Sequence, residues 1–410
     1  MTLLGDLHVV ELATELTATA GRVLAQLGAE VVAVEPPGGS ELRSRPPFVD
    51  DVPDREASLA WWADAAGKRS VVADLEVAEG QERLAALVAW ADVVIESEGR
   101  RLDELGVGPG RFRADQPRLV WVSITPFGRE SARAGQPFTD LTLLAGGGPL
   151  WNCGYDDHSI PPIRGAGGQA LNTAGLYGAI GALTAVAHRD LTGEGQLVDV
   201  NALAACNVTS EQATFNWLVV EEICTRQTGR HAYHTPSAPV QVRCADGAYA
   251  TTGVLPMQPR DFAELHRWMT ELGILDQLPE AIFIEAAAAR EEPIDLSLIG
   301  VDDEITAMLS AAREGMALVA ASLPAVEFFE QSQRRGFPAG AILAPDEAFA
   351  APHTEARHFP MDVEVPERRA TYRFPGSPYL VDSEPLDPLV RPPRLDEHRA
   401  ELLGDEETGT

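Results

Sequence analysis

The chain has 410 residues, 45% of them hydrophobic and 23% charged, which suits a soluble protein of two or three domains. Its 62 acidic and 32 basic residues give a net charge of −30, which repels nucleic acid and anionic lipid. We therefore expect no nucleic-acid and no membrane partner. A small anionic ligand is not excluded, because two or three basic side chains in a cleft are enough to bind it.

The amino-terminal stretch "MTLLGDLHVVELA" has no basic start, apolar core and small-residue cleavage site, so we expect a cytoplasmic protein. The four cysteines lie far apart, without a C-x-x-C pair, and are expected to be reduced thiols. They are Cys153, Cys206, Cys224 and Cys244.

The first half of the chain alternates between strand and helix patterns. A strand at 7–13, a helix at 17–27 that stops at Gly28 and a strand in "EVVAVEPP" are followed by further strands at 69–75, 92–97 and 118–128, with a helix at 80–91. This alternation predicts an α/β fold with an open parallel sheet. The turn after the first strand lacks G-x-G-x-x-G, so a nicotinamide enzyme is not expected.

A long helix of small and apolar residues is predicted from Gln169 to Arg189. Gly175, Gly178 and Gly181 recur every three residues along it, which lets another backbone approach one face or simply allows tight core packing. Hairpin and helix signals from 225 to 330 then indicate a second, smaller α/β domain. His231 and His234 follow no compact zinc spacing, so no metal site is expected.

Several stretches in order resemble family III of the CoA-transferases, also called the CaiB/BaiF family. They include "VVELATELTATAGRVLAQLGAEVVAVEPPGGSELR" at 9–43, "GKRSVVADLEVAEGQERL" at 67–84, "RLVWVSITPFG", "FTDLTLLAGG" and "GLYGAIGALTAVAHRDLTGEGQLVDVNAL". The resemblance covers residues 5 to about 370. It implies a Rossmann-like large CoA-binding domain at 1–220, a small domain at 225–330, a C-terminal segment at 331–410 that returns to the large domain, and two interlocked chains.

The resemblance also implies the chemistry. Members of the family move CoA from an acyl-CoA donor to a carboxylic acid acceptor, and an aspartate attacks the thioester to form a mixed anhydride and then an enzyme-CoA thioester. That aspartate lies four residues before the first glycine of the "GLYGAIGAL" stretch. Counting back from Gly175 reaches Leu171, and no acidic residue lies between His158 and Arg189. Asp140, beside the expected pocket, is a weak alternative nucleophile.

Other positions depart from the family in the same region. The family's "ENFRPG" turn reads "ESEGRR", so Ser97 replaces an asparagine and Glu98 adds a negative charge. The glycine-rich loop that covers the active aspartate reads "TTGVLPMQ", with Gly253 as its one glycine. Phe138 and Thr139 stand where the racemase branch has its histidine, so racemisation is not expected.

The sequence matches the family better at the positions that bind CoA. Arg43, Lys68 and Arg69 match family positions near the adenine and phosphates of CoA, Ser97 lies in the altered turn, and Arg100 and Arg101 compensate for it. The alternative role of Arg43 is a surface ion pair, and the alternative for Lys68 and Arg69 is a solvated pair of charges.

Three interpretations stay open. The chain is a subunit of a CoA-transferase whose homologous partner bears the aspartate, as in two-subunit members such as benzylsuccinate CoA-transferase. Alternatively, it is a homodimeric CoA-thioester transferase, hydrolase or lyase that uses another residue, or a scaffold that binds CoA esters without catalysis. Coenzyme A is the expected cosubstrate in each case, and the substrate acids are not indicated.

Overall fold

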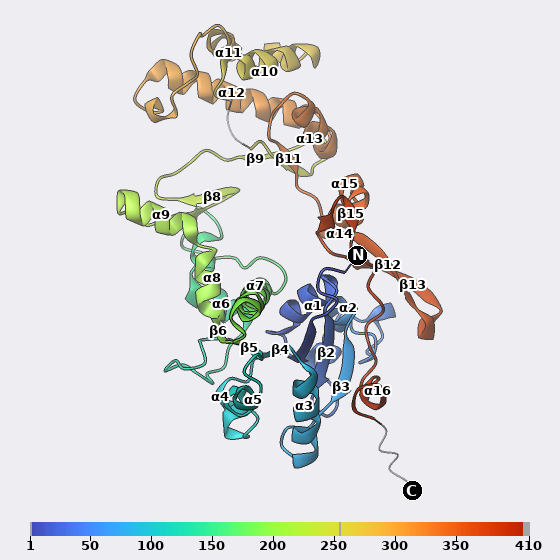
Figure 1. Cartoon of the computed structure of the whole chain (residues 1–410). Coiled ribbons are helices and arrows are strands. Elements are labelled where there is room, and N and C mark those ends of the chain that lie inside the picture. The colour runs from blue at the N-terminus through green and yellow to red at the C-terminus, as the bar shows by residue number, and fades with distance from the viewer. Residues whose placement is uncertain (1, 254–255, 405–410) are drawn as a thin grey trace. The chain divides into compact units, whose positions relative to one another are not determined.

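The computed structural model describes residues 2–253 and 256–404, which form two compact units. The first unit comprises residues 1–153, 162–221 and 349–410, and the second comprises 154–161 and 222–348. Figure 1 shows both along the chain. Phe328 and Phe337 both stack on Trp268 in the core of the second unit.

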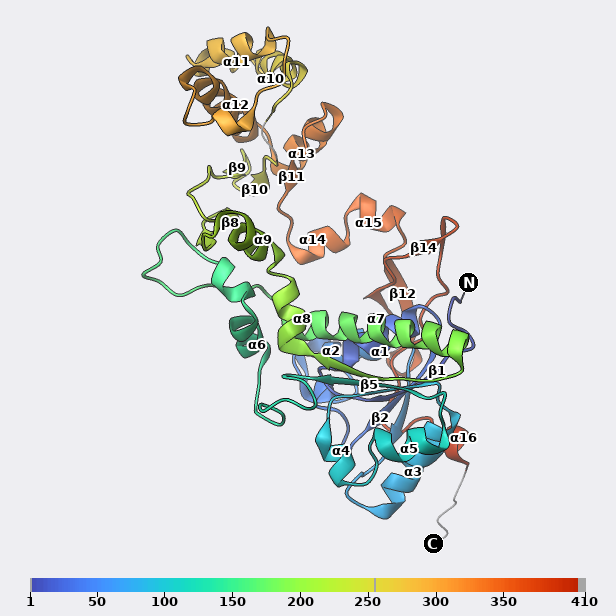
Figure 2. The ribbon, with the colours of Figure 1, turned by 60° about the vertical axis from the view of Figure 1, so that its left-hand side comes forward.

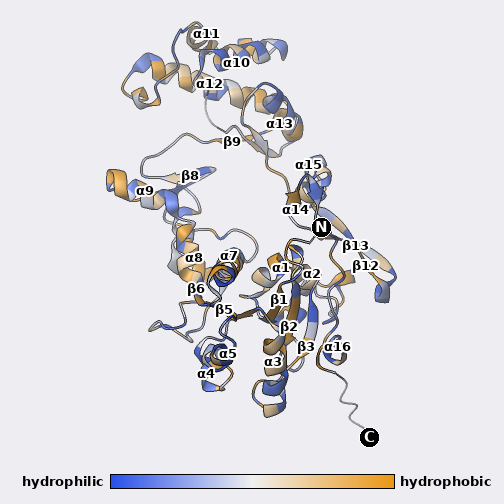
Figure 3. Ribbon diagram, in the orientation of Figure 1, coloured by the Kyte–Doolittle hydropathy of each residue, from blue (hydrophilic) through white to orange (hydrophobic). Residues whose placement is uncertain are grey.

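A parallel sheet is the centre of the first unit. Its strands are β1 (His8–Leu12), β2 (Glu30–Glu35), β3 (Arg69–Val72), β4 (Val93–Glu96), β5 (Val120–Thr125) and β6 (Leu197–Asn201). Their order is β3-β2-β1-β4-β5-β6, with every neighbouring pair parallel. The central strands are buried on both faces and apolar (Figure 3), as parallel strands between helix layers must be. The predicted Rossmann-like α/β fold is confirmed.

Helices cover both faces of this sheet (Figure 2). One face carries α1 (Ala18–Gln26) and α7 (Gln169–Thr192), and the other carries α3 (Ala78–Trp90), α4 (Arg100–Glu104) and α5 (Pro109–Asp115). The remaining helices of this unit are α2 (Leu59–Ala65), α6 (Asp140–Gly147), α8 (Ala202–Val208), α9 (Glu211–Val220), α15 (Pro352–Ala356) and α16 (Arg399–Leu403). Two small antiparallel hairpins complete it, β12 (Pro360–Val365) with β13 (Ala370–Pro375), and β14 (Leu380–Val381) with β15 (Glu384–Pro385).

The glycines of α7 allow close packing, as the sequence suggested. A Cβ on Gly175 would lie 2.6 Å from the Thr19 Cβ and 3.1 Å from the Ala20 backbone nitrogen, so at this step α7 meets the backbone of α1. A Cβ on Gly178 would lie 2.3 Å from the Ile124 side chain. Within the described residues, α7 is the one helix long and apolar enough to cross a bilayer, and it packs on α1, β5 and β6.

The second unit is mainly helical. Its helices are α10 (Pro259–Glu271), α11 (Ala281–Ala288), α12 (Asp303–Ser322), α13 (Ala325–Arg334) and α14 (Pro345–Phe349), the last of which reaches the unit boundary. Its strands are β7 (Thr225–Gln227), β8 (Arg230–Tyr233), β9 (Gln241–Arg243), β10 (Tyr249–Thr251) and β11 (Gly340–Ala341). The predicted hairpin is the β9–β10 pair. Of the loop expected to cover the active site, Val254 and Leu255 lie outside the described residues.

Candidate functional site

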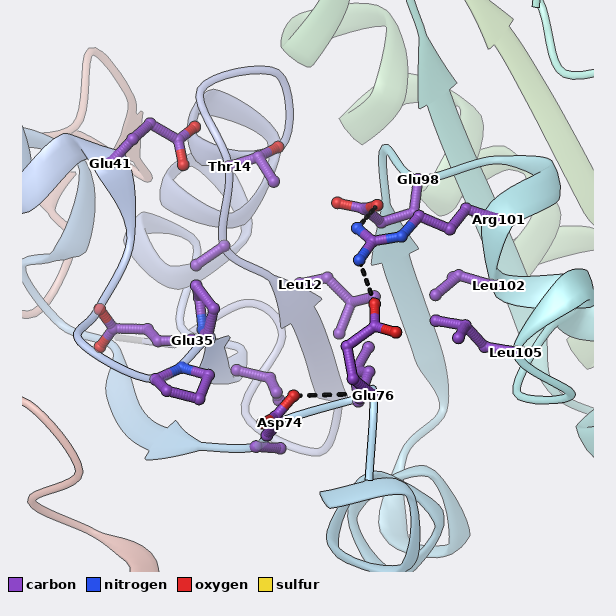
Figure 4. A pocket seen from close by; sticks show the side chains of 16 residues that line it. Leu12, Thr14, Glu35, Glu41, Asp74, Glu76, Glu98, Arg101, Leu102 and Leu105 are labelled. Atoms are coloured by element: carbon purple, nitrogen blue, oxygen red, sulfur yellow. Dashed lines mark hydrogen bonds and ion pairs between the residues drawn. The ribbon is translucent and has the colours of Figure 1, made fainter. Parts of the chain in front are cut away.

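A crevice lies at the carboxyl ends of the parallel strands, where the strand order reverses between β1 and β4 (Figure 4). Ligands of open α/β sheets bind at such a switch point. The crevice has a volume of about 270 Å³ and is lined by residues 12–14 after β1, 34–37 and Glu41 after β2, 73–76 after β3, and Glu98 with α4. A second cavity of about 650 Å³ shares Glu98 and Arg101 with it, and its lining comprises 97–101, Glu104, 125–129, 131–132 and 134–138.

The turn between β4 and α4 is held rigidly. Ser97 Oγ lies 2.7 Å from Thr14 Oγ1, which joins the turns after β4 and β1 across the switch point. Glu96, fully buried at the end of β4, accepts a hydrogen bond from the Gly99 backbone nitrogen at 2.7 Å. Burial raises the pKa of the Glu96 carboxyl, and hydrogen bonds and the Arg129 charge oppose the rise. Ser97 thus lines the neighbouring 650 Å³ cavity and contacts Thr14, which lines the 270 Å³ crevice.

Arg101 is the predicted CoA-binding residue that lines both cavities. Among the described residues that line the 270 Å³ crevice, it is the one base, and it pairs with Glu76 and with Glu98 at 2.8 Å. Figure 4 shows its guanidinium between these two carboxylates. Arg100 lines the neighbouring cavity and pairs with Glu130. Both arginines are more than half exposed, so their charges remain accessible to a ligand.

Arg43 is fully buried, which the sequence did not predict. Its Nε and Nη2 donate to the two carboxylate oxygens of Glu35 at 2.7 and 2.9 Å, its Nη1 donates to Glu56 at 2.8 Å, and its guanidinium lies 4.0 Å from the Trp61 ring centroid. Nη2 also donates to the carbonyl of Pro393 at 3.1 Å. The expected alternative of a surface ion pair is therefore wrong, because the pair lies inside the protein and ties the C-terminal segment to the large unit.

Lys68 occupies a second buried ion pair. Its Nζ lies 2.6 Å from Glu11 Oε2 and donates to the Ala18 carbonyl at 3.2 Å. A Cβ on Gly21 would lie 1.8 Å from the same Glu11 oxygen, so α1 needs glycine here to pass over the pair. Burial raises the pKa of Glu11, and the Lys68 ammonium, the largest opposing influence, lowers it. Lys68 is therefore enclosed rather than solvated.

Arg69 does not lie at the crevice. It is the first residue of β3, and the crevice forms at the opposite, carboxyl ends of the strands. Its Nη1 pairs with Glu401 at 3.0 Å and with Glu30 at 3.2 Å. Its alternative role in an ion pair is the one that the structure shows.

Asp140 holds the start of α7. Its Oδ1 accepts hydrogen bonds from the backbone nitrogens of Ala170 and Leu171 at 2.7 and 3.4 Å, and its Oδ2 accepts one from Arg164 Nε at 2.9 Å. The N-cap residue of α7, Gly168, has no side chain for this purpose, so Asp140 satisfies these backbone donors from α6. A carboxylate engaged on both oxygens is poorly suited to nucleophilic attack.

Leu171 is the third residue of α7, is 6% exposed and lies in a cluster of apolar side chains. The cluster includes Leu16, Ala20, Ile124, Phe127 and Leu143. The nearby Cys206 thiol is also buried, and desolvation together with the Asp140 charge raises its pKa to about 11. A thiol with that pKa is almost entirely protonated at neutral pH and is a weak nucleophile.

Sequence reasoning missed the partners of the buried bases. Glu11 is the penultimate residue of β1, Glu35 is the last residue of β2, and Pro393 comes from the distant C-terminal segment. The glutamates carried a signal, because a charged residue inside a continuous apolar strand is buried only with a partner. No group of three or more His, Cys, Asp or Glu side chains in the described part of the chain is arranged to hold a metal ion.

The strand order and the crevice at the switch point define a Rossmann-like α/β protein. A model of CoA-transferase family III matches residues 4–399, so the chain belongs to this family. It is 31% identical to the succinyl-CoA:(R)-benzylsuccinate CoA-transferase subunit BbsE of Thauera aromatica, over 97% of this chain and 92% of that protein.

It is also 32% identical to the succinyl-CoA:mesaconate CoA-transferase of Haloarcula hispanica, over 99% of this chain and 97% of the relative. Among solved structures, a CaiB/BaiF family protein from Brucella suis is similar with a TM-score of 0.77 and 27% identity, over 98% of this chain and 99% of that one. The chain is therefore a CoA-transferase homologue, and CoA transfer between an acyl-CoA and an acid is the activity of its family.

Proposed function

We propose that this chain is the subunit of a two-subunit family III CoA-transferase that lacks the nucleophile, and that a homologous partner chain supplies the aspartate. The observation that carries the proposal is Leu171, an apolar and buried side chain at the position that matches the family's aspartate. An apolar side chain cannot form the mixed anhydride. The similar BbsE protein is itself called a subunit, which supports a partner chain.

The other groups near Leu171 do not replace a nucleophile. Both oxygens of Asp140 accept hydrogen bonds that hold α7 and Arg164, and the Cys206 thiol is protonated. Serine or threonine attack would require an adjacent general base. Ser97 and Thr14 contact one another at 2.7 Å, and neither has a histidine among its hydrogen-bond partners.

An exposed apolar helix in the first unit supports a protein partner. On α9, the side chains of Phe215, Trp217, Leu218 and Val219 are 50–81% exposed. Figure 3 shows one end of this helix in orange. Clustered exposure of large apolar side chains marks a surface that another protein covers. We propose that the partner covers it in an interlocked dimer, and that the assembly is cytoplasmic.

CoA is the proposed cosubstrate. The proposal keeps Arg101, which lines both cavities, and Ser97, which lines the larger one, as its ligands, with Arg43, Lys68 and Arg69 in supporting ion pairs. Because two similar relatives are named for succinyl-CoA, succinyl-CoA is the donor to test first. Benzylsuccinate and mesaconate are the matching acceptors.

The experiment is to purify this chain alone, the homologous chain that has aspartate at the matching position alone, and both after co-expression. We expect CoA transfer from succinyl-CoA by the co-expressed pair and none by this chain alone, measured by separation of the CoA esters. Replacing the partner's aspartate with asparagine should abolish transfer. Leu171→Met, which conserves volume and apolarity, is the matched control and should leave transfer by the pair unchanged. Transfer by this chain alone would contradict the proposal.

A homodimeric CoA-transferase is the second candidate, because the relative from Haloarcula hispanica is named without a subunit designation. That interpretation requires another nucleophile in this chain. It predicts transfer by this chain alone and trapping of an acyl or CoA adduct on one of its own residues, which mass spectrometry of the denatured protein would detect.

A further inference from the structure

The crevice of this chain carries an unusual charge balance for a ligand rich in phosphate. Glu35, one of its lining carboxylates, is neutralised by the buried Arg43 guanidinium. Four other carboxylates line it, and Arg101 is the one base among the described lining residues. The four carboxylates are those of Glu41, Asp74, Glu76 and Glu98. The surroundings of this crevice therefore repel anions.

The single base is also occupied. Arg101 Nη1 lies 2.8 Å from Glu98 Oε2, and its Nη2 pairs with Glu76 Oε1. Glu98 belongs to the turn after β4, and Glu76 belongs to the segment after β3, so the guanidinium joins the two sides of the crevice (Figure 4). A phosphate that binds Arg101 must displace these carboxylates.

The three side chains are accessible enough for this exchange. The side chains of Arg101 and Glu76 are 54% and 57% exposed, and that of Glu98 is 29% exposed. Exposed ion pairs contribute little to folding, so the three residues are free to change partners without loss of the fold. Because these residues lie on opposite sides of the crevice, their charges act on a ligand that binds between them.

From these observations we infer that Glu76 and Glu98 are specificity-determining residues that weaken the binding of CoA in this chain's own crevice, by occupying Arg101 and by repelling phosphate. The inference rests on the proposed function, in which CoA is the cosubstrate and the productive site belongs to the partner. It adds that CoA binds weakly to Arg101 in this chain while Glu76 and Glu98 are charged. CoA would then bind mainly where the partner's aspartate can act on it.

The test measures binding to the full-length chain by titration calorimetry, with CoA as the charged probe and pantetheine, which has no phosphate, as the neutral probe. The variants are Glu76→Gln, Glu98→Gln and the double variant. Glu82→Gln is the matched control, because it makes the same charge change at an exposed site on α3 outside the crevice. At low ionic strength we expect the double variant to bind CoA about tenfold more tightly than the wild type, with each single variant between them.

Pantetheine affinity should stay within about twofold in the wild type and in every one of these variants, since no phosphate is present to be repelled. Adding Arg101→Gln to the double variant should weaken CoA binding again, because the freed guanidinium would be lost. Equal CoA affinity in the wild type and the double variant, or no CoA binding by either, overturns the inference. Tightening of pantetheine to the same extent as CoA also overturns it, because the effect would then not be electrostatic.

Salt gives a second test without any variant. If the crevice repels CoA, screening should strengthen CoA binding by the wild type as KCl rises from 0.05 to 0.5 M. An attractive crevice gives the opposite sign, and a fall in affinity would overturn the inference. Both tests measure CoA binding and are independent of the transfer assay. Failure of the proposed two-subunit function and failure of this inference therefore give different results.

Discussion

Arg43 and Lys68, which are buried, and Arg101, which is exposed and lines the crevice, were all predicted to bind CoA. Their surroundings in the structure differ. Arg43 and Lys68 have side chains that are 0% and 3% exposed and are enclosed with carboxylates from the sheet, whereas that of Arg101 is 54% exposed. A buried charge that loses its partner is costly, while an exposed one exchanges its partner for water. The comparison teaches that residue type alone does not separate a structural base from a ligand-binding base, and burial does.

Lys68→Met should show the largest effect on stability. It leaves the Glu11 carboxylate without its ammonium partner inside the protein, so we expect the free energy of unfolding to fall by about 3–5 kcal/mol at pH 8, measured by urea denaturation. Without Lys68, the pKa of Glu11 rises further above its ordinary 4.5. The folded state then retains a proton that the unfolded state releases, so the destabilisation should grow as the pH rises from 5 to 8.

The double variant Lys68→Met with Glu11→Gln is its control. It removes the unpaired charge and should recover part of the lost stability. An unchanged unfolding free energy in the single variant would show that the pair is not enclosed.

Arg43→Lys should have the next largest effect. Lysine cannot donate to both oxygens of Glu35 while also reaching Pro393, so we expect a loss of about 2 kcal/mol. Residues 389–398 should also become more sensitive to limited proteolysis, since one of their ties to the large unit is lost. Arg45→Lys is the matched control, because Arg45 pairs with Glu15 at the surface. Equal behaviour of the two variants would remove the distinction between buried and exposed arginines.

Replacement of His398 should have a smaller effect on stability, and this effect should depend on pH. Its Nδ1 accepts a hydrogen bond from the Ser70 backbone nitrogen at 3.2 Å, and burial is the main cause that lowers its pKa below 6.5. Glu397 and Glu401 oppose this shift, whereas Arg69 and Arg391 add to it.

Because the folded state favours the neutral imidazole, its contribution is fully present above pH 6.5 and is lost as the pH falls through that value toward the lowered folded pKa. His398→Asn should therefore reduce the fall in melting temperature between pH 7.5 and 5, by an amount that corresponds to about 1 kcal/mol. The exposed His353→Asn is the control, and the same change in both variants would contradict the assignment.

Arg101→Gln should have the smallest effect on stability, about 0.5 kcal/mol or less, because its ion pairs are exposed. The melting temperature checks this expectation. A large decrease would show that the ion pairs of Arg101 stabilise the fold as those of Arg43 and Lys68 do. It would contradict the distinction between buried and exposed bases. Its influence should appear instead in ligand binding.

The buried positions of Arg43 and Lys68 show why the candidate site was only partly predictable. Both were identified as notable from local sequence, but their glutamate partners lie 8 and 57 residues away along the chain. Ser97 and Arg101 line cavities at the carboxyl ends of the strands because they lie in the turn and helix that follow β4, and the ends of parallel strands meet at one edge. Arg69 is the first residue of its strand and therefore lies at the other edge.

Asp140 illustrates the same limit. Its sequence position suggested a pocket residue, yet its carboxylate is used 30 residues along the chain to satisfy the first backbone donors of α7. The core of the second unit shows the same limit. The stacking of Phe328 and Phe337 on Trp268 depends on distant residues, and sequence periodicity does not report it.

The sequence by itself determined the alternation of strands and helices, the parallel sheet, the closely packed helix at 169–192 and the absence of an acid at position 171. These follow from residue periodicity, glycine placement and side-chain chemistry, which are local properties. Only the tertiary structure decided which bases are enclosed with carboxylates, which one stays accessible, and how Asp140 is used. Burial and ion pairing arise between residues far apart in the chain, so they exist only once the sheet, its helices and the C-terminal segment have packed together.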